Sequence, residues 1–309
     1  MKYVGENPII GMALGSQMGK KLYLGNALLW ESGFPVSYTL DGATTNGSAF
    51  AAEGDTYTAT LNGTSGKQII HSTVVVTMDG TDITSIAYNP VTRTITIADV
   101  TGSISIKAEA ATIPSEYETV HHIGVDTANA NSVITLEYKP NSNTKIELDV
   151  ELKDVQGLLY GTLNGTSASA SSPNFFAYIR ITSSGGSLAF GASASGTSTV
   201  LALRTGKRFN FVCDKGVYTF VRRNQTSPYN YTLTQGSWSS GTKVRLFGRY
   251  NGTTAYGAGK IFRVKISESA VLHDYVPVKR LSDNRLGLYD TIENVATPFI
   301  LASTSYTTE

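Results

Sequence analysis

The sequence predicts an all-β protein with an N-terminal arm, a small β-sandwich and a larger jelly roll of two packed sheets. Apolar and polar residues alternate in many short stretches, and this period of two is typical of strands with one buried face. The 309 residues include 30 Gly and 17 Tyr but only 4 Met and 2 Trp, a composition that favours strands and turns. Charged residues make up 16% of the chain, below the roughly 25% of an average soluble domain.

Residues 1–33 are predicted to form the arm. Gly25 and Asn26 separate two apolar runs, which is the pattern of a two-residue β-hairpin. A two-stranded hairpin is only marginally stable alone, so its large apolar side chains need a surface to pack on. We expect that surface to belong to the next domain or to another protein. The residues assigned to this assembly role are Leu22, Tyr23, Leu24, Leu28 and Trp30.

Residues 34–112 are predicted to form a small β-sandwich. Alternating stretches at residues 56–61, 73–78, 94–97 and 103–108 are separated by turn-forming pairs such as Asn62-Gly63. Short strands with a turn about every 8–12 residues are typical of sandwiches.

Residues 113–309 are predicted to form the larger jelly roll. Pro114 marks the boundary, because proline lacks the N–H that a central strand needs. Strand-like stretches then follow without an amphipathic helix between them, which favours two packed sheets. They cover residues 132–138, 145–152, 158–162, 174–181, 187–190, 208–213, 217–223, 229–234, 243–247 and 260–266.

Particular segments resemble modules of bacteriophage virion proteins. Residues 54–61, 76–84, 94–97 and 100–104 resemble an immunoglobulin-like module. Residues 139–149, 259–266, 272–279 and 286–290 resemble the concanavalin A-like, laminin-G-like jelly roll. Residues 21–31 resemble a short segment, K-x-Y-L-G-x-x-L-x-W-E, found near the start of such proteins.

The resemblance implies a structural protein of the tail, the baseplate or a fibre, exposed on the phage particle. The arm would then bind other virion proteins, and a homo-oligomer is expected, with a trimer as the fibre-like arrangement. The implied mechanism is adhesion, in which many weak sugar contacts are multiplied by copy number. A purely architectural virion protein without a sugar ligand is the alternative. A cell-surface adhesin of bacteria is disfavoured because the sequence shows no export signal or wall anchor.

The segment Glu147-Leu148-Asp149-Val150-Glu151 places three acids on one face of a predicted strand. Glucanases of the concanavalin A-like fold carry such a strand, so the resemblance raises the hypothesis of a depolymerising glycosidase. A second hypothesis is a structural charge ladder, in which Arg263 and Lys265 stand across from the acids. The sequence favours the ladder, because the intervening aliphatic residues alternate as a core face and no Trp flanks the acids. We therefore predict no enzyme and no catalytic residues.

Basic residues concentrate late in the chain. Residues 1–200 hold 10 Lys and Arg against 17 Asp and Glu, whereas residues 201–285 hold 15 against 4. Aromatic residues are interleaved with these basic residues, and the combination suits an acidic polysaccharide, because rings stack on sugars and Arg binds carboxylates. A nucleic-acid ligand is disfavoured by a net charge of only +1 and the lack of a binding motif. The candidate ligand residues are Arg222, Arg223, Tyr229, Tyr231, Trp238, Arg249 and Tyr250.

The remaining chemistry-bearing residues predict neither a metal site nor a cofactor. The single cysteine, Cys213, lies in a strand-like run and is expected to be a buried, inert thiol. His121 and His122 are predicted to lie in a strand and point to opposite faces, which is poor geometry for a metal. His71 and His273 have no obvious partner. No apolar run approaches the roughly 18 residues of a membrane helix, so no membrane insertion is expected.

Overall fold

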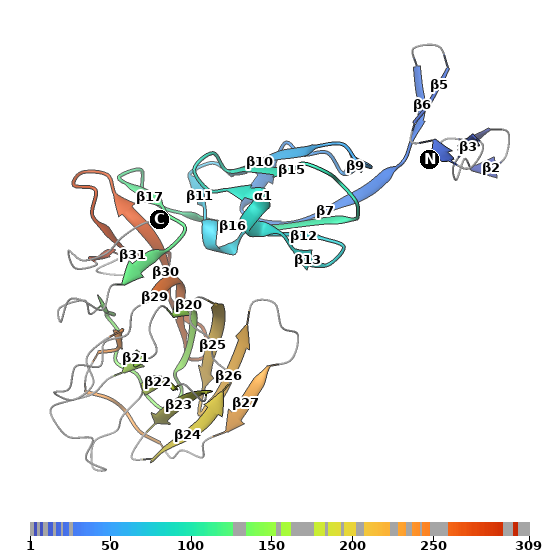
Figure 1. The fold of residues 1–309 in the computed structure, drawn as a ribbon. Coiled ribbons are helices and arrows are strands. Elements are labelled where there is room, and N and C mark those ends of the chain that lie inside the picture. Colours follow the sequence, from blue (N-terminus) through green and yellow to red (C-terminus); the bar gives the residue numbers. More distant parts are fainter. Residues whose placement is uncertain are drawn as a thin grey trace. The chain divides into compact units, whose positions relative to one another are not determined.

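The structure is a computed structural model of residues 1–309 (Figure 1). The chain divides into two compact units, Met1–Thr112 and Ile113–Glu309, and each is described by itself. Its backbone is described over residues 3–4, 7–8, 12–14, 17–19, 21–24, 27–125, 134–152, 156–161, 176–182, 185–192, 195–201, 207–222, 228–232, 237–241, 243–247, 259–292 and 299–301. Side chains are described over residues 32–124, 134–152, 207–221, 228, 230–232, 237–241, 243–247, 259–292 and 299–300.

The arm forms three antiparallel hairpins, each a two-stranded sheet of its own. They are β1 (Tyr3–Val4) with β2 (Asn7–Pro8), β3 (Met12–Leu14) with β4 (Gln17–Gly19), and β5 (Lys21–Leu24) with β6 (Ala27–Glu31). The predicted hairpin around residues 25–26 is confirmed, because Leu24 pairs with Ala27 and Leu22 with Trp30. The side chains assigned to assembly lie outside the described residues, so their role stays a prediction.

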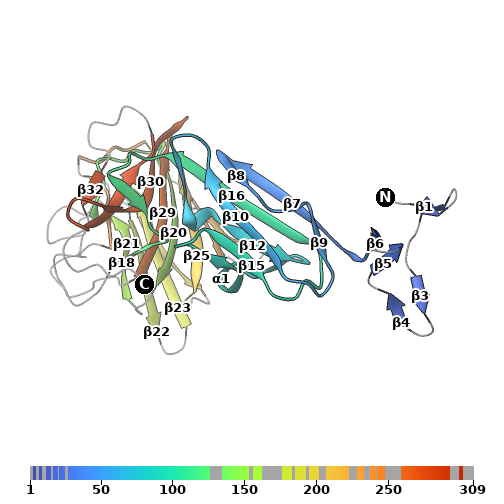
Figure 2. The same ribbon diagram turned by 90° about the horizontal axis from the view of Figure 1, so that it is seen from above.

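The first unit contains a two-sheet sandwich, seen from above in Figure 2. One sheet has the order β14-β15-β10-β8, and the other has the order β13-β12-β16-β7-β9 with β11 beside β16. The strands are β7 (Gly33–Asp41), β8 (Ala43–Thr45), β9 (Phe50–Ala52), β10 (Tyr57–Gly63), β11 (Lys67–Ile69), β12 (Val75–Met78), β13 (Thr81–Asp82), β14 (Tyr88–Asn89), β15 (Thr94–Ile97) and β16 (Ile104–Thr112).

Alternation explains why these residues form strands around one core. In β10 the side chains of Tyr57, Ala59 and Leu61 are buried, while those between them are more exposed. The sequence predicted no helix here, yet a short 3-10 helix, η1 (His71–Thr73), and a single helical turn, α1 (Thr84–Ala87), occur between strands. Strands β7 and β16 pair in parallel. The immunoglobulin-like identity of this sandwich stays a prediction.

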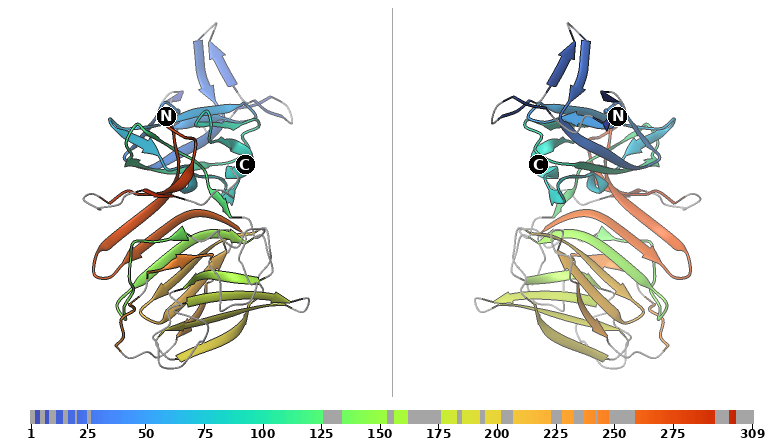
Figure 3. Two further views of the ribbon diagram at one scale, coloured as in Figure 1. Left: turned by 90° about the vertical axis from the view of Figure 1, so that its left-hand side faces the viewer. Right: turned by 90° about the vertical axis from the view of Figure 1, so that its right-hand side faces the viewer.

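The second unit is also a two-sheet sandwich, and Figure 3 shows its strands in layers. The larger sheet has the order β27-β26-β25-β20-β29-β30-β31-β32, with β17 on β30 and β18 on β29, and the smaller has β19-β28-β21-β22-β23-β24. The strands are β17 (Tyr117–Thr119), β18 (Ile123–Val125), β19 (Ile134–Thr135), β20 (Lys145–Leu152), β21 (Gln156–Gly161), β22 (Phe176–Thr182), β23 (Gly185–Ala192), β24 (Ser195–Leu201), β25 (Arg208–Asp214), β26 (Val217–Arg222), β27 (Tyr229–Thr232), β28 (Arg245–Leu246), β29 (Gly259–Ser267), β30 (Val271–Arg280), β31 (Leu286–Asp290) and β32 (Phe299–Leu301).

Both sheets of the second unit contribute to one hydrophobic core. Ile134 and Leu246 from the smaller sheet pack in the same cluster as Leu148 and Phe211 from the larger one. Cys213 lies in this cluster and is 1% exposed, so the predicted buried thiol is confirmed. The all-β class and the predicted architecture of two packed sheets are likewise confirmed.

Candidate functional site

The acidic strand is β20, and its side chains alternate strictly between the core and the outer face. Ile146, Leu148 and Val150 are at most 2% exposed and belong to the core cluster. Glu147, Asp149 and Glu151 therefore lie on the outer face of the large sheet, as the sequence predicted.

Each of these acids makes an ion pair on the outer face. Asp149 accepts two hydrogen bonds from Arg208 of β25, from Nε at 2.7 Å and from Nη2 at 2.5 Å. Glu147 pairs with Lys145 on its own strand, and Glu151 Oε1 lies 4.0 Å from Lys260 Nζ of β29. The acids are therefore engaged in structural ion pairs, as the charge-ladder hypothesis predicted, but Glu147 pairs within its own strand instead of across the sheet.

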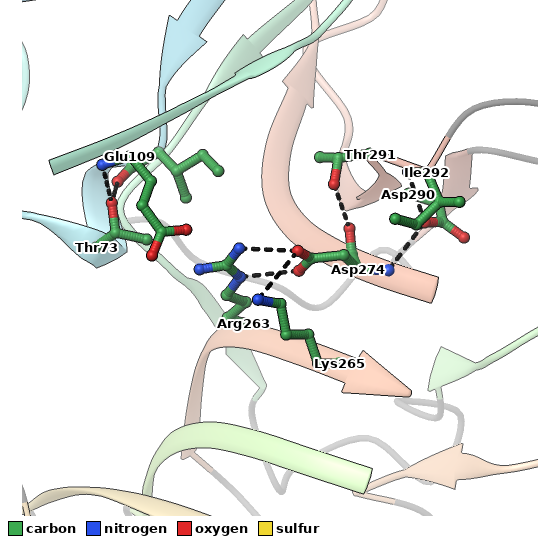
Figure 4. A network of polar contacts seen from close by, with 9 residues as sticks. Thr73, Glu109, Arg263, Lys265, Asp274, Asp290, Thr291 and Ile292 are labelled. Carbon is green, nitrogen blue, oxygen red and sulfur yellow. Dashed lines mark hydrogen bonds and ion pairs between the residues drawn. The ribbon is translucent and has the colours of Figure 1, made fainter. Parts of the chain in front are cut away.

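The sequence assigned some partners wrongly. Lys265 and Arg263 do stand opposite Glu147 and Asp149 in the strand register, as predicted. Arg263, however, donates from Nε and Nη2 to Asp274 of β30, both at 2.8 Å, and Lys265 Nζ lies 3.5 Å from the same carboxylate (Figure 4). Because β29 has a neighbour on each side, its basic residues can reach an acid on β30 instead of one on β20.

This arrangement gives no support to the catalytic hypothesis. A retaining glycosidase needs its two carboxyl groups about 5–5.5 Å apart in a cleft. Glu147 and Glu151 are four positions apart in an extended strand, about 13 Å along the backbone. Their carboxylates interact with Lys145 and Lys260, so the strand uses them within the sheet.

The candidate ligand residues are only partly described. Arg222 ends β26 and Tyr229 begins β27, but their side chains lie outside the described residues, as do Arg223, Arg249 and Tyr250 entirely. Tyr231 is 37% exposed on β27, the edge strand of the large sheet. Trp238 is half-buried and packs against the hydrophobic core, and its carbonyl accepts a hydrogen bond from the Ser142 N–H. Trp238 is thus bound into the fold, which weakens its assignment as a ligand residue.

Strand register places three of these positions in β26 and β27, at the edge of the large sheet. Tyr231 lies opposite Tyr218, and Tyr229 opposite Phe220, while position 222 lies opposite Phe209. The three residues opposite these positions belong to the hydrophobic core, and each is at most 3% exposed. They are Phe209, Phe220 and Tyr218. An aromatic row therefore begins in the core and continues onto the edge strand, where Tyr231 is exposed. Burial raises the pKa of Tyr218 far above that of an ordinary phenol, so this end of the row is uncharged.

A polar cluster that the sequence analysis missed lies at the rim of the same core. His273 Nδ1 is 2.6 Å from Oδ2 of Asp290, whose side chain is fully buried. The other Asp290 oxygen accepts the backbone N–H groups of Asp274 and Ile292. His273 therefore has a firm partner. The signal was weak, because the two residues meet only once β30 and β31 are paired.

A second cluster corrects the prediction for the adjacent histidines. His121 and His122 were expected to lie in a strand and face opposite ways. They precede β18 instead, and their ring centroids are 5.5 Å apart, with the two Nδ1 atoms at 3.3 Å. Both rings also contact Phe262. Because the backbone here is not yet extended strand, alternation does not separate the two side chains.

The residues that the structure describes contain no group of three or more His, Cys, Asp or Glu side chains suited to a metal ion. Within the same residues, no helix has both the length and the apolar character needed to cross a bilayer.

Comparisons with known proteins give structural neighbours only. No family model matches the chain, and no curated protein matches it. Among solved structures it is similar to domains LG4-5 of the mouse laminin alpha1 chain, at 15% identity and a TM-score of 0.34, with 52% of this chain and 45% of that chain covered. It is similar to the CBM40 of a Ruminococcus gnavus IT-sialidase bound to alpha2,3 sialyllactose, at 15% identity and a TM-score of 0.30, with 52% of this chain and 94% of that chain covered. It is also similar to the full extracellular region of zebrafish Gpr126/Adgrg6, at 12% identity and a TM-score of 0.32, with 89% of this chain and 42% of that chain covered.

The chain thus spans less than half the length of the laminin and zebrafish receptor chains. The two-sheet fold described above rests on the strand pairing within this chain.

Proposed function

We propose that this protein is a bacteriophage virion component whose second unit binds an acidic bacterial surface polysaccharide. The virion setting is supported by the sequence resemblance of residues 21–31 and of the two modules to phage virion proteins. Adhesion would then draw its strength from many copies of a weak site on one particle.

The aromatic row at the edge of β26 and β27 is the observation that carries the ligand proposal. Tyr231 continues a row of core aromatics onto an exposed edge, at 37% exposure against 2% for Tyr218 across the strand pair. Such a ring offers an apolar face for sugar C–H groups and a hydroxyl for hydrogen bonding. Arg222 is the last residue of β26 and is opposite Phe209 in the strand register, and an arginine is the residue type that suits a sugar carboxylate.

The arm supports the attachment part of the proposal. Its three hairpins pair only within themselves among the described strands, and isolated two-stranded hairpins are marginal in water. Packing against other virion proteins, or against further copies of this chain, would supply the missing apolar surface. A trimer is the copy number we propose for a fibre-like part.

Binding can be tested on the full chain with a panel of bacterial surface polysaccharides, reading retention and reducing-end release together. We expect retention of at least one acidic polysaccharide without release of reducing ends. Tyr231→Ala should weaken that retention at least tenfold, because a stacked ring is lost. Thr232→Ala is the matched control, since Thr232 is exposed on the opposite face of the same strand.

Each outcome separates the competing functions. Retention that survives Tyr231→Ala would reject the edge of β26 and β27 as the site. Release of reducing ends would revive the glycosidase hypothesis for β20. No retention across a broad panel would favour a purely architectural protein.

A further inference from the structure

A β-bulge places one aromatic side chain on the charged outer face of the large sheet. The register between β20 and β29 shifts after Asp149, which pairs with Arg263, whereas Val150 pairs with Ile261. Phe262 is the extra residue, and it lies outside the core cluster that contains Ile261. Bulges re-aim side chains in this way and are enriched beside functional sites.

Three ionisable side chains cover the Phe262 ring, which is only 3% exposed. The Arg208 guanidinium carbon lies 3.8 Å from the ring centroid, and the His121 and His122 rings lie 5.2 and 5.5 Å from it. Arg208 is also the residue that forms the two-bond ion pair with Asp149, so its positive charge is offset locally.

The two histidines are held in a converging arrangement. Ile123, directly after them, pairs with Ile261 in the ladder between β18 and β29. The His121 and His122 rings meet edge to face at 78°, and their Nδ1 atoms are 3.3 Å apart. His122 is buried and His121 is half-buried, so the pair sits at the boundary between the ring cluster and solvent.

We propose that the His121 and His122 Nδ1 atoms chelate one divalent transition-metal ion of the Zn²⁺ class. Zinc–nitrogen bonds of about 2.0–2.1 Å at a tetrahedral angle place two ligand nitrogens about 3.3–3.4 Å apart. The pair therefore already has the spacing of a tetrahedral chelate. Imidazole nitrogen selects Zn²⁺, Ni²⁺ or Cu²⁺ over Mg²⁺ and Ca²⁺, which prefer oxygen ligands.

The chemistry requires a tautomer change but no other reaction. Without metal, one Nδ1 carries a proton and donates a hydrogen bond to the other Nδ1, which accounts for the close contact. With metal bound, both Nδ1 atoms present lone pairs and each ring keeps its proton on Nε2. Among the described residues no third His, Cys, Asp or Glu completes the set, so the two imidazoles are the ligands that the proposal assigns. With two protein ligands, the site should bind the ion more weakly than a closed four-ligand zinc site does.

This site would lie directly before β18, beside the Phe262 ring at the bulge of β29. It is independent of the polysaccharide proposal, because Phe262 lies on the outer face and the row containing Tyr231 lies on the core-facing side. Loss of metal binding and loss of sugar binding are therefore separate results.

Calorimetric titration of ZnCl₂ into the tag-free full chain at pH 7.5 tests the proposal. We expect one ion per chain, with CaCl₂ giving no heat of binding. His121→Gln and His122→Gln should each weaken binding at least tenfold, whereas His273→Gln, which alters the pair with Asp290, should leave it unchanged.

A measurement on the wild-type chain guards against variants that fail to fold. The protein has four histidines, so ¹⁵N-histidine labelling resolves each imidazole. We expect Zn²⁺ to shift the ring-nitrogen resonances of His121 and His122 and to leave those of the other two histidines unchanged. No heat and no shift up to 1 mM ZnCl₂, or shifts confined to the other two histidines, would overturn the proposal and leave a simple N–H···N hydrogen bond.

Discussion

Replacing Asp149 by Asn should destabilise the second unit far more than replacing Glu147 by Gln on the same strand. Asp149 accepts two hydrogen bonds from Arg208, and the two side chains are 22% and 10% exposed. Hydrogen bonds to charged groups contribute about 1.5–3 kcal/mol each. Asparagine keeps one acceptor but removes the negative charge that faces Arg208, whose guanidinium lies over the Phe262 ring. After allowance for partial exposure, we expect a loss of about 2 kcal/mol in the free energy of unfolding.

Glu147→Gln is the matched control. The Glu147 and Lys145 side chains are 37% and 32% exposed, and an exposed pair of this kind contributes about 0.2–1 kcal/mol. Both variants can be compared by urea unfolding in a Trp30→Phe background, where Trp238 is the only tryptophan and reports on the core of the second unit. Equal losses for the two variants, or a loss below about 0.5 kcal/mol for Asp149→Asn, would refute the structural account of the ladder.

Two further perturbations test the far end of the large sheet. Gly287→Ala should lower the free energy of unfolding by about 1–3 kcal/mol, because the new Cβ would lie 2.4 Å from the Phe299 ring and 2.5 Å from the Ile300 carbonyl oxygen. Gly241→Ala is the control in the same urea unfolding assay, because a Cβ at Gly241 would meet nothing within 4 Å. The hydrogen bonds from Arg280 lower the pKa of Asp283 to about 2 from its usual 3.8, so this pair stabilises the fold above pH 4 and loses its effect as the pH falls to 2. The difference in unfolding free energy between wild type and Asp283→Asn should therefore be present at pH 6 and vanish near pH 2, and an unchanged difference would contradict the assignment.

Strands with one wet face could be predicted from the sequence, whereas strands buried on both faces could not. Lys145–Leu152 was predicted with the bounds that the structure gives, because its burial alternates along the whole strand. Val271–Arg280 was missed as a strand because five consecutive residues from Asp274 to Val278 are buried and Pro277 interrupts the pattern. Pro277 has no N–H to donate to a neighbouring strand, but its carbonyl accepts a hydrogen bond from the Val120 N–H.

Faces of single strands were predictable, but partners across strands were not. Alternation placed Asp149 on the outer face, yet its partner proved to be Arg208 of β25 instead of Arg263 of β29. An interior strand has a neighbour on each side, and the sequence does not say which neighbour supplies the counter-charge. The prediction that His121 and His122 point to opposite faces was wrong for a different reason. Side chains alternate between faces only inside a strand, and these two residues precede β18.

The two faces of the large sheet constrain where recognition can occur. The outer face of β20 and β29 is occupied by ion pairs whose partners lie on adjacent strands, so a polysaccharide bound there would have to replace interactions that stabilise the sheet. Among the residues whose side chains are described, those of β25 and β26 on the core-facing side pack in the hydrophobic core, whereas Tyr231 on the edge strand reaches solvent. A ligand that binds at this edge displaces neither the ion pairs of the outer face nor the contacts of the core. Substitution at Tyr231 should therefore change binding without changing stability, and substitution at Asp149 should change stability without changing binding.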